Sequence, residues 1–141
     1  MPHTTLLKFT FQYDEQSMIP LIPVNFFYRD STPTQPFQDA VLDSGANQIT
    51  IPKALADILG LKLHPRSGPA QTAAGESQAF TATTNFNLGW GGRVVKYTGT
   101  EICVMENCPA ILIGIHPVFK DYNVTIKAYE NTCILEPRQK D

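Results

Sequence analysis

Val41-Leu42-Asp43-Ser44-Gly45-Ala46 takes the chain from an apolar strand into a polar turn. Val41 and Leu42 favour the end of a buried strand, so Asp43 is expected at the edge of the hydrophobic core. Serine and glycine favour the turn that follows, because a serine hydroxyl bonds nearby backbone and glycine permits positive φ and the close approach of another chain. Asp, Ser and Gly are also the usual residues of ordinary turns. The hexapeptide alone is therefore compatible with a structural turn and with a catalytic carboxylate.

Two later segments add to this signal through their order. Residues 71–77 read Gln-Thr-Ala-Ala-Gly-Glu-Ser, a small-residue stretch in which Gly75 is expected at the tip of a hairpin. Residues 110–114 read Ala-Ile-Leu-Ile-Gly, an apolar run that ends at Gly114. Shortly after it, Pro117 can open a short helix. The chain thus contains, in order, a carboxylate turn, a hairpin, and an apolar strand that ends in glycine.

This ordered combination resembles the retropepsin-like aspartic proteases, the single-domain family that includes the retroviral proteases. The resemblance covers roughly residues 37–135, which is most of the chain. It implies a mostly β, acid protease fold: a closed, barrel-like domain with a flap hairpin and one or two short helices. Residues 1–36 would add N-terminal strands and a loop, and residues 1–141 would form one domain.

The length of the chain determines how many catalytic loops it supplies. The 141 residues suit a single domain. They contain one Asp-Ser-Gly and no Asp-Thr-Gly, whereas a two-lobed aspartic protease carries two such loops. One site therefore needs two chains, and we expect a symmetric homodimer in which both Asp43 side chains meet on the two-fold axis. The expected substrate is a peptide or protein, and the chemistry needs no metal or cofactor.

The resemblance also implies roles for individual residues. The catalytic loop would comprise Asp43, Ser44 and Gly45, the substrate would contact Ala46, Asn47, Ala74 and Gly75, and Ile113 and Gly114 would support the loop from beneath. Retroviral members commonly have acidic residues where this chain has Asn47 and Gln48, and His116-Pro117 replaces the polar start of the family's helix. Peptide and dimer contacts near these positions are therefore expected to differ from those of the family.

Composition excludes several classes of partner. The net charge is −2 and the sequence pI is about 5.9, so no basic field attracts nucleic acid or an anionic membrane surface. The apolar stretches are shorter than the roughly 20 residues of a membrane span. The N-terminal segment, with His3 and Lys8 among threonines, lacks the apolar core of a signal peptide. We expect a cytoplasmic protein that binds neither nucleic acid nor membranes.

Cysteine and histidine positions do not form a metal-binding pattern. The three cysteines are Cys103, Cys108 and Cys133, an odd number without repeated spacing, which favours reduced, packed thiols over a disulfide framework. Together with His3, His64 and His116 they match no zinc-ligand spacing. No metal site is expected.

Periodicity and turn residues predict a chain of short strands. The expected strands are residues 5–11, 21–28, 38–42, 49–51, 94–97 and 101–105, with hairpins formed by 69–74 and 78–88 around Gly75 and by 124–128 and 133–135. One helix is expected from Pro52 to Leu59, ended by Gly60, and another from Pro117 to Lys120.

Other functions fit parts of the same pattern. A noncatalytic peptide-binding module with a protease-like fold could keep the turn and the cleft, using Asp39 and Asp43 for binding. A structural β-domain within an assembly would need neither the turn nor the cleft. A serine hydrolase based on Ser44 is disfavoured, because the chain has no Gly-x-Ser-x-Gly elbow and no histidine near Ser44 in sequence.

Overall fold

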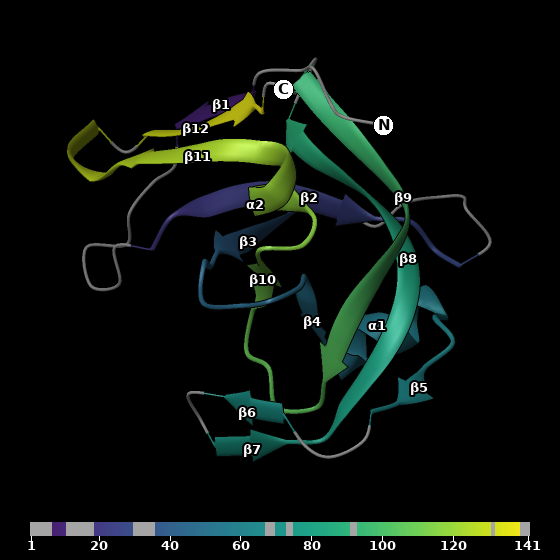
Figure 1. Ribbon diagram of the computed structural model, residues 1–141. Coiled ribbons are helices and arrows are strands. Elements are labelled where there is room, and N and C mark those ends of the chain that lie inside the picture. Colours follow the sequence, from purple (N-terminus) through teal and green to yellow (C-terminus); the bar gives the residue numbers. More distant parts are fainter. Residues whose placement is uncertain are drawn as a thin grey trace.

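The structure, a computed structural model, describes residues 7–10, 19–29, 36–66, 70–72, 75–90, 93–130 and 132–138 (Figure 1). Its strands are β1 (Leu7–Thr10), β2 (Leu21–Phe26), β3 (Gln38–Leu42), β4 (Thr50–Pro52), β5 (His64–Pro65), β6 (Ala70–Thr72), β7 (Gly75–Ser77), β8 (Ala79–Trp90), β9 (Arg93–Met105), β10 (Ile111–Ile113), β11 (Tyr122–Lys127) and β12 (Thr132–Pro137). The helices are α1 (Lys53–Leu59), α2 (Val118–Asp121) and the 3-10 turn η1 (Ala128–Glu130). None of the helices in these ranges is long and apolar enough to cross a membrane.

Six strands close into a barrel. They are hydrogen-bonded in the order β2-β3-β10-β4-β9-β8, and β2 pairs back with β8 to complete the circle. The long strand β8 pairs with β5 near Thr81 and with β2 near Phe86, and closure leaves few strand edges exposed. The expected mostly β, barrel-like fold with two short α-helices is confirmed.

The topology between β3 and β4 determines where the Asp43 turn lies. These strands are consecutive in the chain, yet they do not pair with each other, because β10 lies between them. β10 is parallel to β3, with Ile113 opposite Leu42, and antiparallel to β4, with Leu112 opposite Thr50. The loop at residues 43–49 that joins β3 to β4 must therefore cross over the end of β10.

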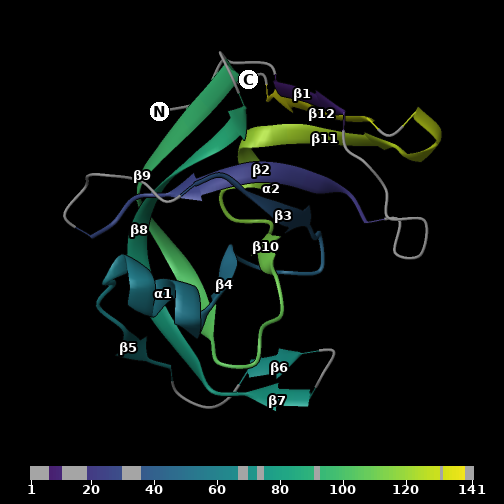
Figure 2. The same cartoon turned by 180° about the vertical axis from the view of Figure 1, so that it is seen from behind.

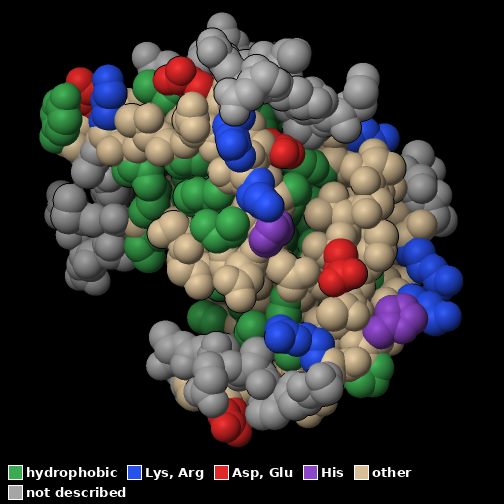
Figure 3. All heavy atoms as spheres, viewed as in Figure 1, with side chains coloured by type: hydrophobic (Ala, Val, Ile, Leu, Met, Phe, Trp, Pro, Cys, Tyr) green, Lys and Arg blue, Asp and Glu red, His purple; other side chains and the backbone are tan. Residues whose placement is uncertain are grey.

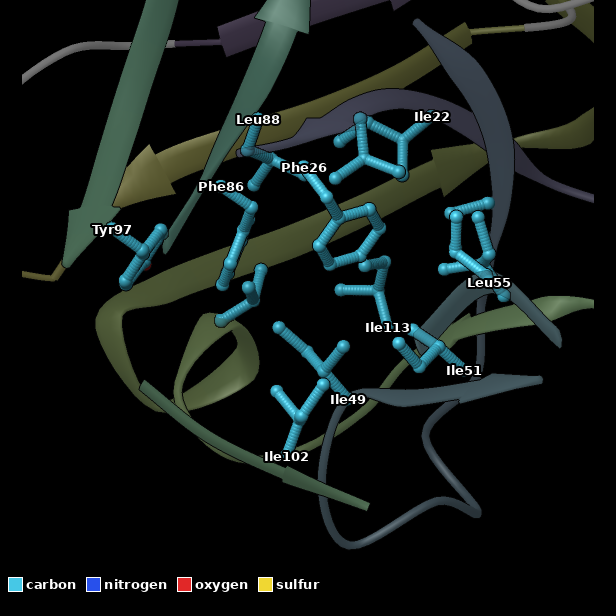
Figure 4. Close-up of a cluster of buried hydrophobic side chains, with 14 of the residues drawn as sticks. Ile22, Phe26, Ile49, Ile51, Leu55, Phe86, Leu88, Tyr97, Ile102 and Ile113 are labelled. Atoms are coloured by element: carbon cyan, nitrogen blue, oxygen red, sulfur yellow. The ribbon is translucent and has the colours of Figure 1, made fainter. Parts of the chain in front are cut away.

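The barrel interior is filled by alternate side chains of its strands. In Figure 4, side chains from β2, β4, β8, β9, β10 and α1 point toward one another, and Phe26 lies among them. Phe26 and Phe86 have ring centroids 5.7 Å apart, and Phe86 stacks on Tyr97 at 5.0 Å. Aromatic side chains of this size supply much of the apolar area that folding removes from water.

Two local features differ from the sequence expectation. Residues 93–105 form one strand instead of two, because Thr98 and Gly99 together oppose Asn85 in a β-bulge. Gly99 has a φ of 64° and donates its N–H to Asn85 Oδ1 at 2.7 Å, so this N–H in the bulge has a hydrogen-bond partner. Helix α1 begins one residue later than expected, at Lys53, with Pro52 as its N-cap, and it ends at Gly60 with a φ of 72° as expected.

A second sheet lies beside the barrel, with strand order β1-β12-β11. It is tied to the barrel by α2, by buried Tyr122 and by the Tyr97 hydroxyl, which donates to Asp121 Oδ2 at 2.8 Å. Burial, followed by the Asp121 hydrogen bond, raises the pKa of Tyr97 well above its ordinary value. Burial, with a smaller contribution from the charge of Asp121, raises the pKa of Tyr122 to about 12.

These shifts predict a loss of stability at alkaline pH. The unfolded chain releases tyrosine protons near pH 10, whereas the folded chain retains them on Tyr97 and Tyr122, so the free energy of unfolding should fall as pH rises above about 10. The slope should be about 1.4 kcal/mol per pH unit for each of the two side chains. Urea unfolding between pH 8 and 11 measures this slope. Tyr97→Phe should make the slope shallower, and Tyr129→Phe, at a side chain 85% exposed, is the control. An unchanged slope in Tyr97→Phe would contradict the assignment.

Candidate active site

Asp43 is the first residue beyond β3, and the turn around it is fixed by its own hydrogen bonds. Its N–H donates to the carbonyl of Ile113 at 2.9 Å, and its carbonyl accepts the N–H of Ala46 at 3.1 Å. The Gly45 N–H donates to Asp43 Oδ1 at 2.9 Å. The carboxylate is half-buried, and its Oδ2 accepts no hydrogen bond from the described part of the chain. One oxygen is thus anchored while the other is available to a reactant.

Gly114 lies directly beneath this turn. A Cβ at Gly114 would lie 2.5 Å from the carbonyl oxygens of both Ala46 and Gln48, closer than real Cβ atoms approach other atoms. The two residues after it hold the loop by its backbone: the Ile115 N–H donates to the Ala46 carbonyl, and the His116 N–H donates to the Asn47 carbonyl, each at 2.9 Å. The crossing of the loop over β10 is therefore tight enough to exclude any side chain at position 114.

The residues of the turn differ in their exposure to solvent. Ser44, Gly45 and Asn47 are exposed, and Ala46 is half-buried. A Cβ at Gly45 would lie 3.1 Å from Asp43 Oδ1, so glycine gives its own N–H room to reach that oxygen. The structure places Asp43, Ser44, Gly45, Ala46, Asn47, Ile113 and Gly114 together at one crossing.

The hairpin at residues 70–77 is present, but its tip differs from the expectation. Thr72 pairs with Gly75, so Gly75 begins β7 instead of forming the tip. The second arm is residues 75–77 and not the expected 78–88, because β8 (Ala79–Trp90) pairs with β9. Gly75 has a φ of 111° and open space around it, so its backbone conformation, and not a close contact, requires glycine. Ala74, expected to contact substrate, lies outside the described residues.

The base of the hairpin is anchored to the turn that follows β9. Ser77 is buried, and its hydroxyl accepts the N–H of Asn107 at 2.8 Å. The Gln78 carbonyl accepts the N–H of Glu106 at 3.1 Å. In the two opposite views the hairpin β6–β7 and the β3–β4 loop project from the same side of the barrel (Figures 1 and 2).

An apolar row beside Asp43 was not expected from the sequence. Leu21, Val41 and Leu112 are paired across β2, β3 and β10, and all three are half-exposed, whereas Ile22, Leu42 and Ile113 beside them are buried. They therefore lie on the outer face of the barrel wall. Figure 3 shows apolar side chains gathered on the face of the molecule that Figure 1 presents. The last three residues of β3 and all of β10 are apolar, which hides the alternation of these side chains between the two faces.

The thiols and the other titratable groups of the described residues are scattered over the fold. Among the described residues, no three His, Cys, Asp or Glu side chains gather closely enough to hold a metal ion. Burial raises the pKa of Cys133 to about 12, and burial also raises the pKa of Cys108. All three cysteines are free, and Cys103 Sγ lies 3.6 Å from Arg66 Nη1.

The family model and two solved structures that match this chain all describe aspartic proteases. Residues 34–117 match the family described as "gag-polyprotein putative aspartyl protease". A retropepsin-like aspartic protease from Rickettsia conorii is 19% identical, with a TM-score of 0.64 over 94% of this chain and 100% of that chain. EIAV protease, in complex with the inhibitor HBY-793, is 18% identical, with a TM-score of 0.50 over 78% of this chain and 93% of that chain. A comparison with curated proteins found no match. The structural similarities confirm the expected retropepsin-like fold.

The close contact of Gly114 with the turn above it predicts that position 114 does not tolerate a side chain. Gly114→Ala should lower the free energy of unfolding by about 3 kcal/mol or more, because the new methyl group meets two backbone carbonyls that cannot move independently. Gly99→Ala is the matched control: it meets open space but has a φ of 64°, and should cost about 1–2 kcal/mol. Urea unfolding measures both. A Gly114→Ala protein as stable as Gly99→Ala would contradict so tight a crossing.

Proposed function

The chain belongs to the retropepsin-like aspartic protease family, and from this premise we propose that it is an aspartic endopeptidase active as a homodimer. The observation that carries the proposal is the hydrogen bonding of the Asp43 carboxylate and the support of its turn. The turn that carries the carboxylate packs closely on Gly114. Oδ1 accepts the Gly45 N–H, and Oδ2 accepts no hydrogen bond from the described residues. A rigid, half-buried carboxylate with one available oxygen suits acid–base catalysis.

The site in one chain is half of what this chemistry requires. Two carboxyl groups must lie close enough that they cannot both ionise, so that one acts as base and the other as acid, as in the paired carboxyl groups of pepsin. Asp39, on the same strand, is four residues away and hence roughly 13 Å from Asp43 along β3. The second carboxyl group is therefore proposed to be Asp43 of a second copy, related by a two-fold axis.

The proposed reaction is hydrolysis by an activated water molecule. The ionised Asp43 takes a proton from water as the water oxygen attacks the peptide carbonyl carbon. The protonated Asp43 of the other copy donates a hydrogen bond to the developing oxyanion, and a proton then passes to the leaving nitrogen as the C–N bond breaks. The exposed Ser44 is proposed to link the two turns across the axis.

The substrate is proposed to lie extended between the turn and the hairpin β6–β7. The Ala46 and Asn47 carbonyls already accept hydrogen bonds from Ile115 and His116, so they are turned away from a substrate. The Gly45 carbonyl and the exposed Asn47 side chain are the groups proposed to meet the peptide backbone. Because Asn47 is neutral, these contacts would be hydrogen bonds between neutral amides instead of charge-assisted ones.

Replacing the carboxylate tests the proposal. Asp43→Asn should reduce cleavage of a peptide library by at least about a thousandfold, since it removes both the base and the acid. Its free energy of unfolding should stay within about 1 kcal/mol, because the amide keeps the volume and can still accept from Gly45. Asp39→Asn, the same change at an exposed aspartate on the same strand, is the matched control and should keep full activity. Equal cleavage by the Asp43→Asn and wild-type proteins would refute the mechanism and favour a noncatalytic module.

Mixing wild-type and variant chains tests whether two chains share one site. A ninefold excess of Asp43→Asn, mixed with wild type after dissociation and reassociation, should reduce the activity to about one-tenth, because nearly all wild-type chains then pair with an inactive partner. An equal excess of Asp39→Asn should raise the activity instead. Activity unaffected by the Asp43→Asn chains would show that a single chain is the active unit.

A further inference from the structure

One row of positions on the barrel wall connects the Asp43 turn to strand β9. β10 pairs parallel with β3 and antiparallel with β4, and these registers, continued past the end of β10, place Gly114 between Asp43 and Gln48. A Cβ at Gly114 would lie 2.5 Å from the Gln48 carbonyl oxygen, which agrees with this position. β4 pairs parallel with β9, and the same extension places Gln48 opposite Glu101. The row therefore consists of Asp43, Gly114, Gln48 and Glu101.

The side chains of Asp43, Gln48 and Glu101 point out of the barrel. Each of the three is next in sequence to a residue buried in the barrel core, and consecutive residues of a strand point to opposite faces. These buried neighbours are Leu42, Ile49 and Ile102. The four strands of the row also lie together in both views (Figures 1 and 2). Glu101 thus shares the outer wall on which the substrate of Asp43 is proposed to lie.

The Gln48 side chain reaches across the row to Glu101. Gln48 Nε2 lies 3.5 Å from Glu101 Oε1, at the long limit of a hydrogen bond. Gln48 itself is half-buried, and its carbonyl accepts the Thr50 hydroxyl at 3.3 Å. Glu101 is exposed, and its Oε2 accepts no hydrogen bond from the described part of the chain. The amide of Gln48 therefore orients the carboxylate without neutralising it.

Glu101 has no cationic partner among the described residues. The ion pairs of this part of the chain are Lys53–Asp57 and Lys127–Glu130. On the same wall, Arg66 directs Nη1 to Cys103 Sγ at 3.6 Å and does not pair with Glu101. Residues 44–48 are all uncharged. Apart from Asp43, Glu101 is thus the charged side chain of this row.

The spacing of the strands indicates how far this charge lies from the site of reaction. Neighbouring strands are about 4.8 Å apart, so three steps separate Asp43 from Glu101 by at most roughly 14 Å. An extended peptide along the row covers that distance in about four residues. A long side chain of the peptide also spans part of it. Glu101 is therefore within reach of a substrate residue up to about four positions from the scissile bond.

We propose that Glu101 is a specificity-determining residue, whose carboxylate binds an arginine or lysine side chain of the substrate. This inference rests on the proposed function and names its substrate class, peptides with a basic residue near the scissile bond. A guanidinium can form two parallel hydrogen bonds with a carboxylate, so arginine is expected to be preferred over lysine. Gln48 is a positioning residue in this scheme, because its amide holds the carboxylate toward the row.

Peptides that differ at a single residue test the proposal. Each position up to four residues on either side of the scissile bond is varied in turn among arginine, norleucine and glutamate. At one position, kcat/KM of the wild-type protein should be at least about fivefold higher for arginine than for norleucine, and lowest for glutamate. The arginine preference should fall in 1 M salt, since the carboxylate is exposed.

Variants assign the preference to Glu101. Glu101→Gln should bring the ratio of kcat/KM for arginine and norleucine close to one, and Glu101→Lys should favour glutamate instead. Glu136→Gln, the same change at an exposed glutamate of β12, is the matched control and should keep the arginine preference. Equal kcat/KM values for the arginine and norleucine peptides in wild type, or a preference that survives Glu101→Gln, would overturn the proposal.

Binding to a variant that lacks the catalytic carboxylate separates this inference from the proposed function. Fluorescence anisotropy measures the dissociation constants of the same peptides with Asp43→Asn. Tighter binding of the arginine peptide, lost on adding Glu101→Gln, would support the role of Glu101 even if the wild-type protein cleaves nothing. Conversely, Asp43-dependent cleavage without an arginine preference would overturn the role of Glu101 and leave the protease intact. Absence of both binding and cleavage would overturn both proposals.

Discussion

The crossing of the β3–β4 loop over the end of β10 is the constraint on which the rest of the structure depends. β10 separates two strands that are neighbours in sequence, so the loop between them must pass over it. At the crossing point Gly114 has room for no side chain, and the next two N–H groups bind loop carbonyls. The position of Asp43 is thus set by barrel strands and not by a flexible loop. A catalytic carboxylate needs this kind of support, because a displacement of about 1 Å can cost much of the rate.

The same arrangement explains why one chain is proposed to be insufficient. Strand β3 of one barrel places one carboxylate, Asp43, at the crossing, and Asp39 on the same strand is too distant to pair with it. The β11–β12 hairpin and the β3–β4 loop lie on the same side of the barrel in Figures 1 and 2, and α2 connects β10 to β11 within a few residues. The proposed enzyme therefore takes its second carboxylate from another chain.

The apolar row Leu21, Val41 and Leu112 bears on what such a site could accept. These side chains flank the Asp43 turn on the outer wall, and all three are half-exposed. A contiguous exposed apolar surface can mark the binding site of a ligand or a partner. In the proposed enzyme, apolar substrate side chains next to the scissile bond would cover it, while the neutral Asn47 would provide amide contacts to the peptide backbone.

Local residue chemistry was enough to predict the parts of this protein that depend on near neighbours. The Asp-Ser-Gly turn and the helix between Pro52 and Gly60 could be read from local residues, because turns and caps act over a few residues. The barrel-like β fold was implied by the resemblance to the retropepsin-like family. A hairpin near Gly75 was also predicted, but its second arm is residues 75–77 and not 78–88, and Gly75 lies in that arm instead of at the tip. What only the tertiary structure decided is pairing between distant segments: β10 inserted between β3 and β4, β1 joined to β12, and the outward face of Val41 and Leu112. These depend on which strands meet, and a continuous apolar run carries no periodicity that distinguishes the inner face from the outer one.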